Sequence, residues 1–382
     1  MPGPRTTAAG LGLVEAQQVT LFTSQQPLAL ARGGRLDSVQ VRYETYGRLS
    51  PQRDNAVFIC HALTGDAHAA GQQAGADKPG WWDNLIGPGR PLDTDRFFVV
   101  CPNILGGCQG TTGPGSLNPA TGRVFGLDFP ILDMADFVSV HRRLCQQLGL
   151  SRLLAVIGGS LGGMQVLEWA LSHPSDLANA CVIAASSRLS AQNIAFSAVA
   201  REAIMRDPGF HQGQYSQYGD SPDQGLSIAR MMAHITYLSE EALALKFDRE
   251  PERDGLNHGF GVDFAVESYL HHQGEVFLDR FDALSYLYLS RVMDYFDPFS
   301  RPQATAAIAA ARPNLLVCSF TSDWRFGPEH SRRVVGHLER AGLPVTYREL
   351  DSKYGHDSFL LPIPRYHDTL RAFLDRALEV GQ

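Results

Sequence analysis

Short, continuous runs of apolar residues recur along this chain, and longer segments with a helical pattern separate them. Runs rich in β-branched and aromatic residues suit strands that are buried on both faces, as in a parallel sheet. Segments with apolar residues at helical spacing are 131–150, 161–174, 329–342 and 364–380. The runs that we predict as strands are 39–47, 55–63, 96–104, 153–159, 180–185, 314–320 and 345–351. Strands that alternate with helices predict an α/β fold with a mostly parallel, doubly wound sheet.

The stretch from about 188 to 300 interrupts this alternation. It has long helical patterns at 190–207 and 225–247 and no clear buried strand. Open α/β sheets bind their ligands outside the carboxyl ends of the strands. We therefore predict a core built from 1–187 and 301–382, with a helical cap, 188–300, inserted over those ends. The first twenty or so residues are small and polar, and we expect them to form a loosely held arm.

The composition narrows the class of function. The chain has 382 residues and a formal net charge of −7, whereas nucleic-acid binders usually carry a basic face. No apolar run approaches the roughly 18 residues that a membrane span needs, and the N-terminus lacks a secretory signal pattern. The six cysteines show neither CxxC pairs nor zinc-type spacing. We therefore expect a cytoplasmic enzyme with no metal and with neither nucleic acid nor a membrane as a partner.

The sharpest motif is Gly158-Gly159-Ser160-Leu161-Gly162, which fits the pattern G-x-S-x-G. It follows a predicted strand and opens a predicted helix, which is the context that this pattern requires. Small flanking residues allow a tight turn at the serine, and the helix N-terminus points N–H groups at a developing oxyanion. We therefore predict that Ser160 is a nucleophile.

A serine nucleophile needs a base and an acid that orients the base, and in this kind of fold they follow the serine in the order acid, then histidine. His356 lies in a short loop directly after the last predicted strand, so we predict it as the base. Asp323 follows the preceding strand, so we predict it as the acid. Asp351 is its competitor, but it stands at a strand end and fits a turn better.

An oxyanion hole needs a second N–H group from the loop after an earlier strand. The sharp turn after the strand at 55–63 supplies the N–H of Leu63, which we pair with that of Leu161. His61 precedes the serine in the chain, which breaks the expected order, so we predict a supporting role for it. No lysine or arginine lies near Cys60 in the sequence, so we predict a buried, inert thiol there.

Eight segments of the chain also fit one known family, in the order that the family has them. They are 60–71, 80–114, 158–169, 190–204, 229–243, 267–289, 321–326 and 355–360. Through them the chain resembles the homoserine O-acyltransferases of methionine biosynthesis, which have the α/β-hydrolase fold. The resemblance implies acyl transfer from acyl-CoA to Ser160 and then to the hydroxyl of homoserine. It also implies a homodimer built through the cap, and it implies no cofactor besides the acyl-CoA substrate.

The same resemblance implies two contacts to the acceptor, which is an amino acid. Arg230, on a predicted cap helix, could meet the carboxylate of homoserine in a bidentate pair. Asp357, next to His356, could meet its ammonium group. Without the resemblance, Arg230 would be interpreted as an ordinary surface arginine of a helix.

Arg325, two residues after the predicted acid, is the residue from which we predict the identity of the acyl group. A succinyl group ends in a carboxylate that is costly to bury without a cation, whereas an acetyl group is small and uncharged. Family members that use succinyl-CoA resemble this chain in carrying arginine at this position. We therefore predict a homoserine O-succinyltransferase. The first alternative is a homoserine O-acetyltransferase, and the second is an esterase or thioesterase with the same three catalytic residues.

Overall fold

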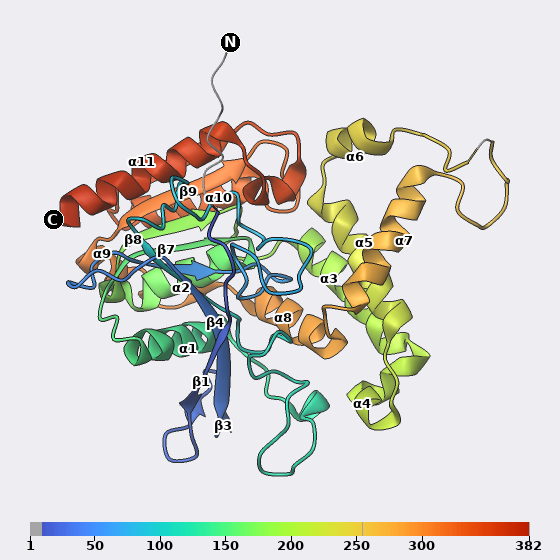
Figure 1. The fold of residues 1–382 in the computed structure, drawn as a ribbon, viewed down its shortest axis with the longest axis horizontal. Helices are drawn as coiled ribbons and strands as arrows, with labels where there is room; N and C mark the ends of the chain where they lie inside the picture. The colour runs from blue at the N-terminus through green and yellow to red at the C-terminus, as the bar shows by residue number, and fades with distance from the viewer. Residues whose placement is uncertain (1–9, 254, 382) are drawn as a thin grey trace.

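The centre of the computed structural model, which describes residues 10–253 and 255–381, is a sheet of eight strands (Figure 1). Their order across the sheet is β1-β4-β6-β5-β7-β8-β9-β10. β4 is antiparallel to both of its neighbours, and every other neighbouring pair is parallel. The strands are β1 (Gln17–Phe22), β4 (Val39–Tyr46), β5 (Ala56–Cys60), β6 (Phe98–Pro102), β7 (Leu153–Gly159), β8 (Leu177–Ile183), β9 (Asn314–Phe320) and β10 (Val345–Leu350). The predicted mostly parallel α/β sheet is confirmed.

Helices cover both faces of this sheet. α1 (Met134–Gln147), α2 (Leu161–Ser172), α9 (Ala306–Ala311) and α10 (Pro328–Arg340) contribute to the apolar cluster on one face. α11 (Pro364–Gly381) packs on the other face, together with a segment around Trp82. Figure 1 shows α11 and α1 on opposite sides of the strands. A two-stranded ribbon, β2 (Leu28–Ala29) with β3 (Arg35–Leu36), stands apart from the main sheet.

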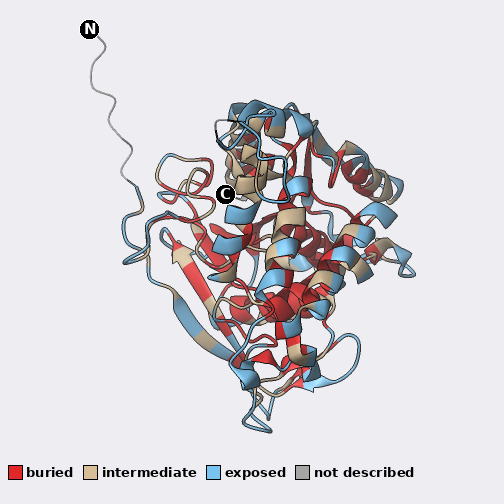
Figure 2. Ribbon diagram, turned by 90° about the vertical axis from the view of Figure 1, so that its right-hand side faces the viewer, coloured by how far each residue is buried: buried red, intermediate tan, exposed pale blue. Residues whose placement is uncertain are grey.

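The continuous apolar runs of the sequence follow from this sandwich of layers. In β5 the side chains of Phe58 and Cys60 enter one apolar cluster, whereas those of Val57 and Ile59 enter the other. Successive side chains of a strand point to opposite faces. Since both faces are covered, every position of β5 is buried. Figure 2 shows buried residues gathered in the interior and exposed residues on the outer helices and loops.

In the described part of the chain, seven α-helices lie between β8 and β9; the last, α9, packs on α2 of the core, and we call the other six the cap helices. They are α3 (Ala191–Arg206), α4 (Tyr215–Tyr218), α5 (Asp223–Tyr237), α6 (Glu240–Phe247), α7 (Ala265–Leu278) and α8 (Ala283–Tyr295). α5 packs between α3 and α7, beside the sheet in Figure 1. The predicted boundaries at 188 and 300 lie in the links before α3 and after α8. The division into a core and a cap as separate domains stays a prediction.

Two local predictions were wrong. The expected loose arm included β1, which in fact pairs with β4 in an antiparallel ladder, because a short edge strand needs few buried side chains and Leu21 supplies one. Residues 1–9 of that arm lie outside the described residues. The helical pattern at 225–247 is two helices, since Leu238 is extended and Ser239 caps α6 by accepting the N–H of Ala242.

None of the helices among the described residues is both long enough and apolar enough to cross a membrane.

Candidate active site

Ser160 stands on a sharp turn between β7 and α2. Its backbone has φ 58° and ψ −124°, in a region that residues other than glycine rarely adopt. A Cβ atom at Gly158 would overlap the backbone of Gly162, and one at Gly162 would overlap the carbonyl oxygen of Cys60. The glycines therefore allow β7, α2 and the end of β5 to approach closely enough to hold the serine in this conformation.

The structure brings Ser160, His356 and Asp323 into one chain of hydrogen bonds. The Oγ of Ser160 lies 2.8 Å from Nε2 of His356, and Nδ1 of His356 lies 2.7 Å from Oδ2 of Asp323. Asp323 Oδ1 accepts the backbone N–H groups of Arg325 (3.0 Å) and Phe326 (2.8 Å). Because the carboxylate accepts from Nδ1–H, Nε2 is left unprotonated and can accept the serine proton.

These three residues follow the carboxyl ends of three parallel strands, with β8 lying between the strand of the serine and that of the acid. Ser160 follows β7, Asp323 follows β9, and His356 follows β10 in a short 3₁₀ segment (Gly355–Leu360). Asp351 lies at the exposed end of β10, where its Oδ1 accepts a hydrogen bond from the hydroxyl of Thr321 (3.1 Å). The geometry therefore pairs Asp323, and not Asp351, with the histidine.

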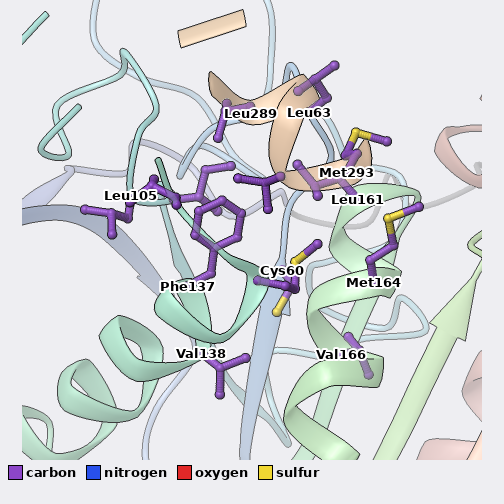
Figure 3. Packing of buried hydrophobic residues seen from close by; sticks show 14 of the residues in the cluster. Cys60, Leu63, Leu105, Phe137, Val138, Leu161, Met164, Val166, Leu289 and Met293 are labelled. Atoms are coloured by element: carbon purple, nitrogen blue, oxygen red, sulfur yellow. The ribbon is translucent and has the colours of Figure 1, made fainter. Parts of the chain in front are cut away.

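The N–H groups of Leu63 and Leu161 meet a requirement of an oxyanion hole. In the part of the chain that the structure describes, neither N–H donates a hydrogen bond to another protein group. Figure 3 shows the side chains of Leu63 and Leu161 among buried apolar groups, with Cys60 below them. The leucine side chains thus anchor two backbone segments whose N–H groups remain available.

His61 and Cys60 support this region without taking part in the chain of hydrogen bonds at Ser160. Nε2 of His61 accepts the N–H of Ile104 (3.0 Å), so Nδ1–H donates to the carbonyl oxygen of Ala62 (2.7 Å). Desolvation by burial lowers the pKa of His61 and raises that of the Cys60 thiol. Both side chains are therefore neutral, and His61 fixes the turn that carries Leu63.

Arg230 projects from α5 and keeps part of its guanidinium unpaired. Its Nε and Nη1 atoms are buried and have no hydrogen-bond partner among the described residues. The guanidinium packs over the ring of Phe277, with Cζ 4.6 Å from the ring centroid. Burial raises the pKa of Asp357 to about 6, an effect that the charges of His356 and Arg230 partly offset. The positive charge of Arg230 thus favours the ionised form of the Asp357 carboxyl group, next to His356.

Arg325 is also buried, with only 7% of its surface exposed. Its Nη1 donates a hydrogen bond to the hydroxyl of Thr236 (2.8 Å), and it forms no ion pair with any of the described carboxylates. Burying a charge without a counter-ion is unfavourable. Arg230 and Arg325 are therefore both largely buried and form no ion pair with a carboxylate of the residues that the structure describes.

The ring of Tyr237, which no sequence motif marked, lies among these groups. Its centroid lies 5.9 Å from the ring of His356, 5.9 Å from Cζ of Arg230 and 5.5 Å from Cζ of Arg325. Tyr237 follows Arg230 by seven residues on α5, a spacing that places both on one face of a helix. That spacing could have pointed to Tyr237, but a tyrosine in a helix is equally typical of an apolar core.

The cap helices touch the catalytic loops where α5 ends. Gly355, next to His356, has φ +74°, and the position of a Cβ atom there is occupied by backbone atoms of Tyr237, Leu238 and Ser239. The indole N–H of Trp324, next to Asp323, donates to the carbonyl oxygen of Leu238 (2.8 Å). The link between α5 and α6 therefore contacts the loops of both the base and the acid.

Comparison with known structures places this geometry in a family. A family model described as the alpha/beta hydrolase fold matches residues 55–362. A crystal structure of homoserine O-acetyltransferase from Bacillus anthracis superposes with a TM-score of 0.87 at 26% identity, covering 95% of this chain and 98% of that one. Esterase E22 superposes with a TM-score of 0.85 at 27% identity, covering 95% of this chain and 100% of that one.

Sequence relatives are more closely similar. A homoserine O-succinyltransferase from Nocardioides sp. strain JS614 is 57% identical over 95% of this chain and 99% of its own length. A homoserine O-acetyltransferase from Caulobacter vibrioides is 50% identical over 93% of this chain and 94% of its own length. The predicted membership is therefore confirmed: this chain belongs to the homoserine O-acyltransferases of the α/β-hydrolase fold.

Proposed function

We propose that the chain transfers a succinyl group from succinyl-CoA to the hydroxyl of L-homoserine. The observation that carries this proposal is the chain of hydrogen bonds at Ser160, close to Arg230 and Arg325, which have no carboxylate partner in the described part of the chain. The acceptor and the succinyl group each bring one carboxylate. The name of the relative from Nocardioides supports the same donor and acceptor.

In the first half-reaction, His356 Nε2 takes the proton of Ser160 as Oγ attacks the thioester carbonyl carbon. The N–H groups of Leu63 and Leu161 donate to the oxyanion that forms. Asp323 stabilises the imidazolium through Nδ1–H. The carbon–sulfur bond then breaks, His356 returns the proton to the CoA sulfur, and a succinyl ester remains on Ser160.

In the second half-reaction, homoserine replaces CoA. His356 takes the proton of its hydroxyl, and the oxygen attacks the ester carbonyl. The bond to Ser160 breaks, and His356 protonates the serine. We propose that Arg230 binds the carboxylate of homoserine and that Asp357 binds its ammonium group. The cap helices beside the site favour transfer over hydrolysis, because they restrict the access of water.

Arg325 supports succinyl-CoA over acetyl-CoA. Its guanidinium lies in the loop that follows Asp323, and a succinyl carboxylate would supply the anion that the described residues lack. A hydrogen bond to a charged group is worth about 1.5–3 kcal/mol, which corresponds to a preference of about tenfold to a hundredfold. An acetyl group would leave this cation buried and unpaired.

One assay separates the three candidate activities. Purified protein is given succinyl-CoA or acetyl-CoA, with and without homoserine, and the release of CoA thiol is followed. We expect turnover only with homoserine, a higher kcat/KM for succinyl-CoA, and loss of this preference in Arg325→Leu. Steady thiol release without homoserine would indicate an esterase or thioesterase, and a wild-type preference for acetyl-CoA would indicate an acetyltransferase. Ser160→Ala is the control for background hydrolysis.

We also propose that the protein is a homodimer that assembles through the cap helices. Each of these helices exposes at least one large apolar side chain, and on α3, α5 and α7 these include Ile194, Val199, Ile228, Ile235 and Val276. Sedimentation of the wild type and of Ile228→Asp tests this, since a dimer through this surface should dissociate in the variant.

All six cysteines are free thiols, which supports our proposal of a reduced, cytoplasmic compartment. We propose no cofactor or metal, and turnover should survive a chelator.

A further inference from the structure

The hydroxyl of Thr236 makes two hydrogen bonds whose directions are determined. Thr236 is 1% exposed and lies in the last turn of α5. Its Oγ1 donates to the carbonyl oxygen of Ala233 (2.8 Å) and lies 2.8 Å from Nη1 of Arg325. A hydroxyl has one proton and a guanidinium only donates. Toward Arg325, the threonine oxygen is therefore an acceptor.

This arrangement holds the guanidinium without neutralising it. Among the described residues, Thr236 is the side chain that accepts a hydrogen bond from the guanidinium of Arg325. A guanidinium has five N–H groups and can bind a carboxylate through two of them. A carboxylate in place of Thr236 would compete with an anionic substrate for the same charge. A neutral acceptor fixes the orientation of the head group and leaves its charge available.

The backbone of Arg325 is anchored separately from its head group. Its N–H donates to Oδ1 of Asp323 (3.0 Å), and its carbonyl oxygen accepts from Nδ2 of Asn193 (2.8 Å). Loss of the Thr236 hydroxyl would therefore release the guanidinium while the loop of the catalytic acid keeps its own hydrogen bonds. Such a change should affect a substrate that binds the guanidinium and spare one that does not.

We infer that Thr236 is a positioning residue for the donor. Its hydroxyl orients Arg325 so that the free N–H groups of the guanidinium meet the terminal carboxylate of the succinyl group. This inference rests on the proposed succinyltransferase function and extends it, because donor selection then depends on a cap helix as well as on the loop after β9. Thr236 itself contacts neither substrate and acts only through Arg325.

The test compares three substitutions of Thr236. Thr236→Val keeps the shape and removes the hydroxyl, Thr236→Ala removes it with less bulk, and Thr236→Ser retains it. For each variant, kcat/KM is measured with succinyl-CoA and with acetyl-CoA at one homoserine concentration, alongside the melting temperature. We expect Thr236→Val and Thr236→Ala to lose about tenfold with succinyl-CoA, mainly through KM, and to keep acetyl-CoA use within about twofold. Thr236→Ser should restore the wild-type ratio.

A double-mutant cycle with Arg325→Leu isolates the coupling. In that background, Thr236→Val should not change the ratio of the two donors further. Equal losses with both donors, or a further change of the ratio in the Arg325→Leu background, would show that Thr236 acts independently of Arg325 and would overturn the inference. A wild type that prefers acetyl-CoA would overturn the proposed donor as well. A wild-type preference for succinyl-CoA that survives in Thr236→Val would overturn the inference alone.

Discussion

Substitution of Asp323 by asparagine should inactivate the enzyme while the fold is retained. Oδ1 accepts the backbone N–H groups of Arg325 and Phe326, and Oδ2 accepts the imidazole Nδ1–H of His356. An amide that turned its NH₂ toward the backbone would lose two buried hydrogen bonds, each worth about 1 kcal/mol or more. The asparagine therefore keeps its oxygen toward the backbone and points its NH₂ at Nδ1 of His356.

This orientation reverses the protonation of the histidine. Nδ1 must then accept, so the proton moves to Nε2, which faces Ser160 and can no longer take the serine proton. Where an amide imposes the wrong tautomer on a catalytic histidine, kcat falls by about 10⁴, or about 5.5 kcal/mol of barrier. We expect a loss of that order here.

The assay is steady-state release of CoA thiol with saturating homoserine, together with a thermal melt of each variant. Asp351→Asn is the matched control, because Asp351 is exposed and its carboxylate is bonded to Thr321 rather than to the histidine. It should retain turnover within about threefold of the wild type, since surface substitutions of this kind have small effects. If Asp323→Asn keeps more than a tenth of wild-type turnover, or if Asp351→Asn is the more damaging change, our assignment of the acid is wrong.

Three further predictions concern the acceptor and the cap. Arg230→Ala should raise the KM for homoserine while the first burst of CoA release survives; an unchanged KM, measured by varying homoserine, would assign Arg230 a structural role. The carboxyl group of Asp357, with a pKa raised to about 6, is protonated below that pH, so the KM for homoserine should rise as pH falls through 6 and should lose this dependence in Asp357→Asn. Gly355→Ala should lower the free energy of unfolding by about 2 kcal/mol or more. The reason is that φ is +74° and that a Cβ atom would lie 2.5 Å from the backbone nitrogen of Ser239. A melting temperature equal to that of the wild type would contradict this.

Central strands could be located from the sequence because their environment leaves a strong local pattern. The runs predicted at 153–159 and 314–320 coincide with β7 and β9, which are buried on both faces by helices. β1 escaped detection because its position at the edge of the sheet requires little burial, and its sequence begins with two glutamines. The break between α5 and α6 depends on contacts with loops far away in the chain, which no local pattern records.

In the site, too, some residues could be predicted from local sequence patterns and others depend on tertiary contacts. Ser160, Asp323 and His356 each follow the carboxyl end of a parallel strand, so strand order and residue type together bring them to one edge of the sheet. Thr236 and Tyr237 reach the site only because α5 packs with a particular orientation against the core. That orientation results from tertiary packing, so their roles became visible only in the structure.

The close contact at Gly355 has a consequence for how substrates enter and leave. The backbone between α5 and α6 fills the space where a side chain at Gly355 would stand, and its Leu238 carbonyl also accepts from Trp324. Because the cap helices contact both catalytic loops, a rigid-body opening of the cap would displace His356 and Asp323 as well. Acyl-CoA and homoserine should instead enter and leave through movements of side chains, while the backbone around the entrance stays in place. Amide hydrogen exchange should accordingly protect 236–240 and 353–357 together, with or without bound substrate, as a single cooperative unit.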